Sequence, residues 1–321
     1  MRQYIFRRIL LIIPTMIGVT MLVSLIAELL PGDFIDVMLA DHVAQGEDKD
    51  AIRAKWEEQL GWNDPWIVQY GNWLWNALRG DLGTSLIGSF QTVNEELKTR
   101  IPVTLELGVL SLLVGVAIAL PVGIISAVRQ DSVLDYLMRG GAIIALSLPG
   151  FWMAVLIIRV IYPELGLPSF PPIYNDPTEN LPENLRQMYI PAILLGIGLA
   201  GPVMRLTRGE MLEVLRQDYV RTARAKGLQE NSVIVRHAMR NALIPVLTLI
   251  GLSASILVGG SVIMETIFSL PGMGRRMIVA LKDRDIPVVM GIMVVIAVVV
   301  IVANLLIDIA YSLVDPRIRY N

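Results

Sequence analysis

Six long apolar runs, separated by polar segments, dominate the hydrophobic pattern of this chain. An α-helix rises about 1.5 Å per residue, so roughly 20 apolar residues cross the ~30 Å hydrocarbon core of a bilayer. Each run reaches that length. The runs cover residues 9–30, 101–128, 136–162, 189–209, 242–265 and 287–311. This pattern predicts an all-α membrane protein with six transmembrane helices.

The charges between the runs indicate how the helices are oriented. Cytoplasmic connections of membrane proteins are enriched in Lys and Arg. If the amino terminus lies inside, every inward-facing connection of this chain is basic. Outside the central loop described below, the residues concerned are Arg2, Arg7, Arg8, Arg129, Arg139, Arg205, Arg208, Arg216, Arg317 and Arg319. We therefore expect both termini in the cytoplasm, and the first run as a retained anchor rather than a cleaved signal peptide.

The segment 31–100 is a polar insert after the first run. It is rich in acidic residues, which are tolerated on the translocated side, so we expect it outside. Five of the six tryptophans fall in it, namely Trp56, Trp62, Trp66, Trp73 and Trp75. Two interpretations stay open, because Trp suits both settings. The insert forms either short helices among the lipid headgroups or the core of a small extramembrane subdomain.

A second external segment, 266–286, carries charges of both signs. They are Arg275, Arg276, Lys282, Arg284, Asp283 and Asp285. We expect a helical hairpin there. Its charges either contact an acidic partner surface or lipid, or form an ordinary solvated face.

The composition agrees with a membrane location and excludes several kinds of chemistry. Hydrophobic residues make up 54% of the chain and charged residues 17%, against about 45–50% and about 25% in soluble domains. The chain has no cysteine, and its two histidines, His42 and His237, lie far apart, so we expect no catalytic metal site. Gly is never followed by Lys, so no phosphate-binding loop exists. We expect the chain to bind no cofactor and to hydrolyse no ATP itself.

A polar, basic segment, 218–241, separates the fourth and fifth runs. Residues 219–226 are good helix formers, and Gly227 can adopt the left-handed conformation that ends a helix. Asn231 or Ser232 is expected to cap a second helix. The excess of Arg and Lys places this loop in the cytoplasm. Two short helices beneath the membrane would form a contact surface for a partner.

Within this loop, residues 222–227 read Thr-Ala-Arg-Ala-Lys-Gly, and His237-Ala238-Met239 follows after nine residues. This pattern resembles the Glu-Ala-Ala…Gly loop of bacterial ABC importer permeases, through which the membrane subunit contacts its ATPase. Arg221 and Thr222 replace the Glu and Ala of the general pattern, and His237 and Arg240 replace its Ile and Pro. The dipeptide/oligopeptide/nickel branch shares these departures. Further matching segments are 30–33, 79–85, 102–107 and 315–320, so the resemblance covers nearly the whole chain.

The resemblance implies the fold of a type I ABC importer permease in two parts. The first, 1–100, would hold the anchor helix 9–30 and the external insert 31–100. The second, 101–321, would be the permease core of five transmembrane helices with a cytoplasmic coupling loop at 210–241. The loop residues implied in ATPase contact are Arg221, Thr222, Ala223, Arg224, Ala225, Lys226, Gly227 and His237.

The resemblance also implies a set of partners in a bacterial cytoplasmic (inner) membrane. They are the lipid bilayer, a second homologous permease subunit, two ATPase subunits that use the ATP, and an extracytoplasmic substrate-binding protein. No nucleic acid is expected. The substrate would be a peptide or a related small solute, since the branch includes carriers of dipeptides, oligopeptides, glutathione, nickel chelates and some sugars.

Ionisable residues inside the runs are few and lie mostly near the run ends. Glu106 is deeper, and either lines an external vestibule or pairs with Arg159. No series of mid-span acids or histidines provides a proton relay. Two rival classes remain: an ATP-independent channel or secondary carrier, and an intramembrane enzyme, although no His lies within a run to activate a nucleophile.

Overall fold

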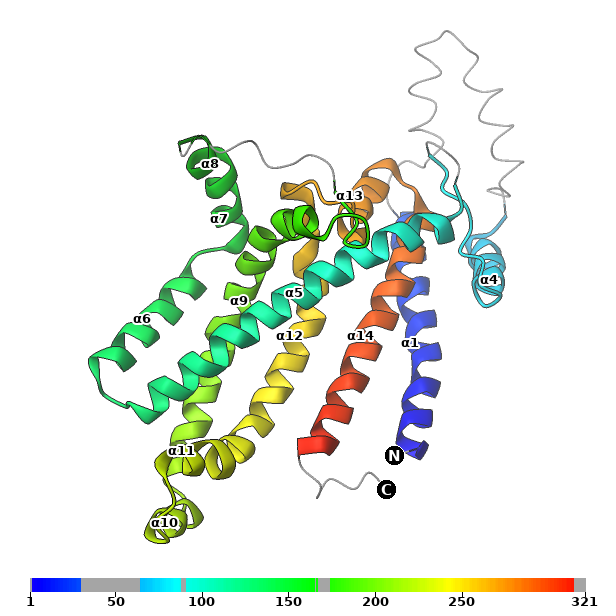
Figure 1. Cartoon of the computed structure of the whole chain (residues 1–321). Helices are drawn as coiled ribbons and strands as arrows, with labels where there is room; N and C mark the ends of the chain where they lie inside the picture. Colours follow the sequence, from blue (N-terminus) through cyan, green and yellow to red (C-terminus); the bar gives the residue numbers. More distant parts are fainter. Residues whose placement is uncertain (1, 30–63, 88–90, 165, 167–173, 315–321) are drawn as a thin grey trace. The chain divides into compact units, whose positions relative to one another are not determined.

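The computed structural model describes residues 2–29, 64–87, 91–164, 166 and 174–314. Helices form most of this part of the chain, where an isolated bridge between Thr84 and Thr92 is the one β-pairing. The longer helices are α1 (Arg2–Leu29), α4 (Trp66–Ala77), α5 (Val93–Val128), α6 (Val133–Ser147), α9 (Leu181–Leu215), α12 (Met239–Ile267), α13 (Met273–Asp283) and α14 (Ile286–Val314) (Figure 1). The shorter ones are α7 (Gly150–Leu156), α8 (Tyr162–Glu164), α10 (Asp218–Ala225), α11 (Glu230–Ser232) and the π-helical η1 (Ile157–Ile161) and η2 (Val233–Ala238). The prediction of an all-α protein is confirmed.

Several of these helices can cross a membrane. Four are long and apolar enough within the described residues, namely Val93–Val128, Leu181–Leu215, Glu230–Ser253 and Ile286–Leu305. A fifth crossing results if the bent pair Val133–Ser147 and Gly150–Glu164 counts as one span. In α1, the apolar stretch found is the shorter Ile13–Ile26. The structure supports four or five crossings, and the predicted count of six is not confirmed.

The third predicted run, 136–162, is broken rather than continuous. α6 ends at Ser147 and α7 begins at Gly150, and the two parts are bent by 84°. Leu148 between them is extended, with φ −99° and ψ 116°. The ring of Pro149 disfavours helical backbone at the preceding residue, which favours a break here, although α9 continues through Pro191 and Pro202. This local constraint interrupts an apolar pattern that reads as one uninterrupted helix.

The chain divides into two compact units. Among the described residues, those within 104–270 and 302–314 belong to one unit, and those within 2–103 and 271–301 belong to the other. The predicted division between residues 100 and 101 falls inside α5, which continues through it without interruption. That division stays a prediction.

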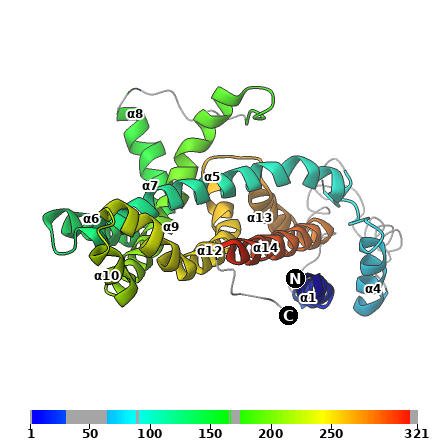
Figure 2. The ribbon, with the colours of Figure 1, turned by 60° about the horizontal axis from the view of Figure 1, so that its bottom comes forward.

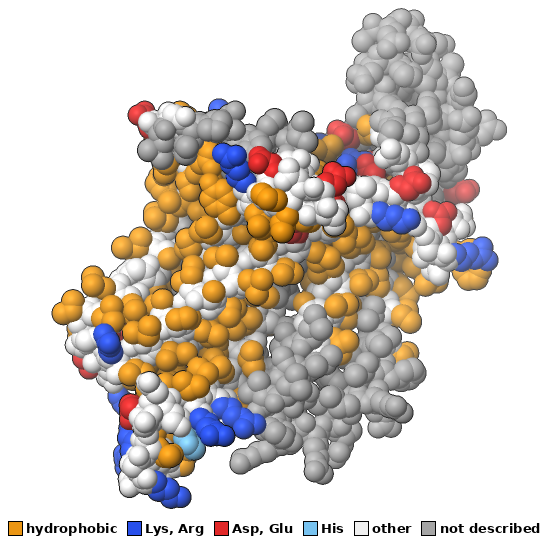
Figure 3. Space-filling model, in the orientation of Figure 1, with side chains coloured by type: hydrophobic (Ala, Val, Ile, Leu, Met, Phe, Trp, Pro, Cys, Tyr) orange, Lys and Arg blue, Asp and Glu red, His pale blue; other side chains and the backbone are white. Residues whose placement is uncertain are grey.

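Helix α9 is central to the first unit. α6, α7 and α12 pack against it (Figures 1 and 2). α5 approaches it so closely that a Cβ at Gly196 would lie 2.8 Å from the carbonyl oxygen of Ser111, so this position requires glycine. The buried apolar cluster here consists of Ala119, Ala142, Leu199, Ala200, Val203, Met204 and Val246. Apolar side chains also cover the outward faces of α5 and α6 (Figure 3), as a lipid-facing surface requires.

In the second unit, α4 lies along α1 (Figures 1 and 2). The Tyr70 hydroxyl donates to the carbonyl oxygen of Ile17 at 3.0 Å and lies 3.0 Å from Thr20 Oγ1. Trp66 Nε1 donates to Ser24 Oγ at 2.9 Å. The short helix expected in the insert is therefore attached to the first apolar helix, while Trp56 and Trp62 lie outside the described residues.

The same unit contains α13, and this single helix lies between the end of α12 and the start of α14, where we expected a helical hairpin. One of its charges is internal rather than solvated. Arg276 is buried, with Nε donating to Glu96 Oε2 and Nη2 to Asp285 Oδ2, both at 2.9 Å. Ser85 donates to the same Asp285 oxygen at 2.6 Å. This network joins α13 to the starts of α5 and α14.

Candidate functional site

The loop between α9 and α12 presents a short helix, α10. The chain leaves α9 at Leu215, turns, forms α10, and leaves it through Gly227 at φ +75°. The predicted first helix and its glycine stop are confirmed. The predicted cap of the second helix was wrong, because that helix already begins at Glu230, after an extended Gln229, and makes no side-chain capping bond. From Glu230 the chain stays helical through η2 into α12.

One face of α10 is anchored in the first unit. Val220 and Ala223 are buried and pack with Val233 of η2 and with Val214 and Leu215 of α9. Ala223 therefore faces inward, although we expected it on the contact surface. This internal face holds α10 between α9 and η2.

The other face of α10 is exposed and mainly basic. Its exposed side chains include Arg221, Thr222, Arg224, Ala225 and Lys226. Lys and Arg side chains gather around this end of the unit in Figure 3. The structure thus brings most of the predicted loop residues onto one accessible surface.

Two ion pairs order this surface. Arg224 donates to Glu230 through Nη2 at 2.7 Å and through Nε at 3.2 Å, which joins α10 to α11. These hydrogen bonds raise the pKa of Arg224. Arg221 pairs with Asp218 one turn away at 3.3 Å. Exposed pairs of this kind contribute only about 0–1 kcal/mol each, so they orient the side chains rather than stabilise the fold.

The side chain of His237 takes no part in the hydrogen bonds that hold α10, but its backbone does. The Tyr219 hydroxyl donates to the His237 carbonyl oxygen at 3.4 Å and accepts from Asn241 Nδ2 at 2.7 Å. Tyr219 and Asn241 were not predicted as site residues. Their separation of 22 residues gives no local sequence signal.

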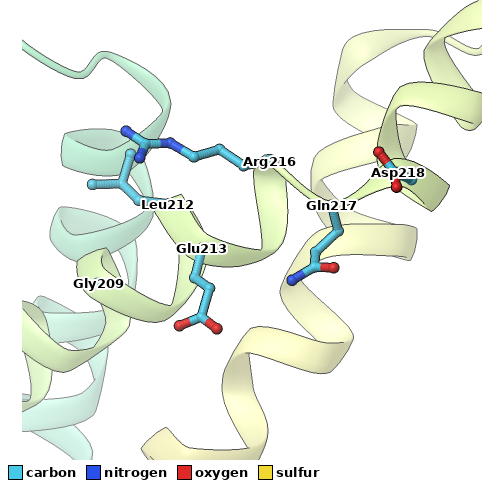
Figure 4. A pocket seen from close by; sticks show the side chains of 6 residues that line it. All are labelled: Gly209, Leu212, Glu213, Arg216, Gln217 and Asp218. Atoms are coloured by element: carbon cyan, nitrogen blue, oxygen red, sulfur yellow. The ribbon is translucent and has the colours of Figure 1, made fainter.

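A cavity of about 480 Å³ lies where α9 meets α10. It is lined by Gly209, Leu212, Glu213, Arg216, Gln217 and Asp218. Figure 4 shows the Glu213 and Gln217 side chains projecting to the same side of the ribbon. The lining combines two acidic residues, Glu213 and Asp218, with Arg216 and an amide. The sequence pattern did not indicate this cavity beside the basic face of α10.

The structure does not bring Glu106 and Arg159 together. Glu106 Oε2 accepts from the Tyr174 hydroxyl at 2.7 Å and from Asn184 Nδ2 at 3.3 Å. Burial, and then the Glu106 carboxylate, raise the pKa of Tyr174. Arg159 is exposed in η1 and forms no ion pair within the described residues. The role of Glu106 in a pathway stays a prediction.

In the described part of the chain, helices with several membrane crossings and a short helix displayed between two of them define a multi-pass membrane protein. Residues 119–320 match the family described as "Binding-protein-dependent transport system inner membrane component". The chain belongs to this family.

Full-length relatives support the assignment. The "Oligopeptide transport system permease protein AppB" of Bacillus subtilis (strain 168) is 40% identical over 321 residues, covering 100% of both chains. The "Dipeptide transport system permease protein DppB" of Escherichia coli (strain K12) is 38% identical over 342 residues, covering 100% of this chain and 99% of the relative. A solved structure of the MetNI methionine ABC transporter in an inward facing conformation aligns with TM-score 0.54 and 19% identity. It covers 68% of this chain and 96% of that chain, and shows a shared fold.

Family membership settles the broad function. The chain is a multi-pass inner membrane component of a binding-protein-dependent ABC transport system. It is a transport subunit rather than an enzyme, and its system includes a binding protein and an ATPase. The rival interpretations as a channel, a secondary carrier or an intramembrane enzyme are set aside.

Proposed function

We propose that this chain is one of two homologous permease subunits of an ATP-driven peptide importer. An extracytoplasmic binding protein delivers the peptide, and two ATPase subunits hydrolyse the ATP. The proposal rests chiefly on full-length relatives whose names describe oligopeptide and dipeptide transport. No cofactor is needed on this chain itself, because ATP is used on the ATPase subunits.

In this proposal the segment 210–241 is the coupling loop and lies in the cytoplasm with both termini. The basic connections support that orientation. The exposed face of α10 docks on the ATPase, with Arg221, Arg224 and Lys226 supplying charge complementarity and Ala225 allowing close approach. The buried face, Val220 and Ala223, passes the movement of α10 to α9 and α12 through the packing around it.

Reconstitution of the intact complex tests the proposal. The permease pair, the ATPase subunits and the binding protein are placed in vesicles, and uptake of labelled di- to pentapeptides is followed with and without ATP. Mass spectrometry of the ligand that co-purifies with the binding protein identifies the natural substrate. Uptake that needs both ATP and the binding protein supports the proposal. A bound glutathione, nickel chelate or sugar, with no peptide uptake, would contradict the peptide assignment.

A further inference from the structure

An ion pair between a buried carboxylate and a half-buried arginine joins α6 to α9 in the unit that carries α10. Arg208 of α9 donates to Asp135 of α6 through Nε to Oδ1 at 2.9 Å and through Nη2 to Oδ2 at 2.7 Å. Asp135 is completely buried. The Ser126 hydroxyl of α5 donates to Asp135 Oδ1, and Arg208 Nε lies 3.1 Å from Ser126 Oγ. One carboxylate therefore holds three helices together.

The same carboxylate organises the turn between α5 and α6. The backbone N–H of Asp131 donates to Asp135 Oδ2 at 3.1 Å, and Asp131 itself has φ +60°. Ser132 caps α6 by accepting from the Asp135 backbone N–H at 3.2 Å. Each oxygen of Asp135 thus has two hydrogen-bond donors. The fully satisfied carboxylate specifies a single arrangement of its neighbours.

A second contact ties α9 to the same turn closer to α10. Arg216 Nη2 donates to Gln130 Oε1 at 3.4 Å. Arg208 lies in α9, and Arg216 is the residue that caps its carboxyl end, eight residues later. Between them, Met211 of α9 is buried against Ala127 of α5. The last turns of α9 are therefore fixed to α5 and α6, and α10 follows directly after Arg216 and Gln217.

An ion pair with a buried carboxylate often stabilises a fold no more than apolar residues of similar size would, whereas its directional hydrogen bonds fix geometry. We propose that Asp135 and Arg208 are positioning residues for coupling. They fix α9 to α5 and α6. A displacement of α10 therefore moves all three helices together, and α9 does not slide past the other two. This inference rests on the proposed function, because it assumes that the ATPase acts on α10.

The test uses the reconstituted complex and three variants. Asp135→Asn removes the charge but keeps the size, Arg208→Lys keeps the charge but loses the two-point contact, and Asp135→Leu with Arg208→Met gives an apolar pair. We measure ATPase association, ATP hydrolysis stimulated by the binding protein, and peptide imported per ATP hydrolysed. For Asp135→Asn and the apolar pair we expect normal association and a ratio lowered about threefold to thirtyfold. For Arg208→Lys, the amount of peptide imported per ATP hydrolysed should lie between that of these two variants and that of wild type.

The matched control is Asp285→Asn. Asp285 is also completely buried and bound by an arginine, a serine and a backbone N–H, but belongs to the other unit. We expect it to lower the melting temperature as Asp135→Asn does, with an unchanged peptide-to-ATP ratio. An equal fall in the ratio for both variants would overturn the inference, because general destabilisation would then explain it.

The apolar pair gives a second way to overturn the positioning role. It does so if the variant folds and imports as much peptide per ATP hydrolysed as wild type. Failure of all three variants to assemble also overturns the positioning role, since the ion pair would then be structural. If wild type imports no peptide, the proposed substrate class fails instead. Hydrolysis stimulated by the binding protein then tests the positioning role, and it should fall in Asp135→Asn but not in Asp285→Asn.

Discussion

Val220 of α10 and Val233 of η2 are completely buried and pack together, although 13 residues separate them. This contact attaches the exposed basic helix to the start of α12. It makes α10 a fixed projection rather than a loosely tethered loop, as the proposed coupling role requires.

The first prediction concerns this contact. Val220→Thr keeps the side-chain shape but buries a hydroxyl, which costs about 1–3 kcal/mol when no partner is available. We expect faster proteolytic cleavage within 217–229 and weaker ATPase association. Val235→Thr is the control, because Val235 is exposed two residues beyond Val233. Equal effects of the two substitutions would show that α10 is not anchored through Val220.

The second prediction concerns Gly227. A Cβ at this position would meet nothing within 4 Å, so only its φ of +75° restricts substitution. Gly227→Val should impose about 1–3 kcal/mol of strain, because β-branched residues avoid this region. Gly227→Asn should be tolerated, since Asn adopts it readily. We expect stimulated hydrolysis and uptake to fall together in the valine variant alone. If stimulated hydrolysis and uptake fell in both variants, the backbone conformation would not explain the result, and a contact made by the glycine itself would.

The third prediction concerns the position of α4. Thr20, which Tyr70 contacts, lies nine residues before the end of α1, about 13 Å along the helix. The exposed apolar side chains of α4, such as Ile67, should therefore face acyl chains in the outer leaflet. The chain has no cysteine, so a nitroxide on Ile67→Cys can be placed without background labelling. It should be accessible to oxygen and protected from a water-soluble nickel chelate.

A label on Arg129→Cys, in the exposed turn after α5, serves as the aqueous control. Equal nickel accessibility at both positions would favour the extramembrane subdomain instead.

The fourth prediction concerns Glu106. Hydrogen bonds to charged groups contribute about 1.5–3 kcal/mol, so Tyr174→Phe should lower the melting temperature of the purified permease. Tyr136→Phe is the control, because Tyr136 is exposed. If Glu106 also lines the pathway, Tyr174→Phe should change the KM for charged peptides. Equal melting temperatures for both variants would mean that the Tyr174–Glu106 bond contributes no stability.

The apolar runs predicted most helices but not their full lengths. α5 begins at Val93 and α9 at Leu181, before the apolar stretch in each case, because polar residues extend a helix without adding to its hydropathy. Pro149 indicates a helix break after Leu148. The apolar residues on both sides of it form one long run, however, and that run predicted a single helix. The continuous helix from Glu230 into α12 passes through a π-helical segment for which the sequence gave no sign.

The candidate site was predictable only where its features are local in the sequence. Gly227 and the basic helix before it are local patterns, so the sequence revealed them. The partners of buried acids are not local, since Asp135 meets Arg208 73 residues away. Arg208 counted only as one of many basic residues on the inner side. Such pairs depend on tertiary packing, which no periodicity encodes.

The central claim is that the exposed face of α10 binds the ATPase. The most direct measurement is cross-linking in the assembled complex with a thiol-reactive photoprobe on Ala225→Cys or Ala223→Cys. Ala225 is exposed, whereas Ala223, half a turn away, is buried. We predict cross-links to the ATPase from the Ala225→Cys variant and none from the Ala223→Cys variant. An assembled, hydrolysing complex with no cross-link from Ala225→Cys would contradict the account.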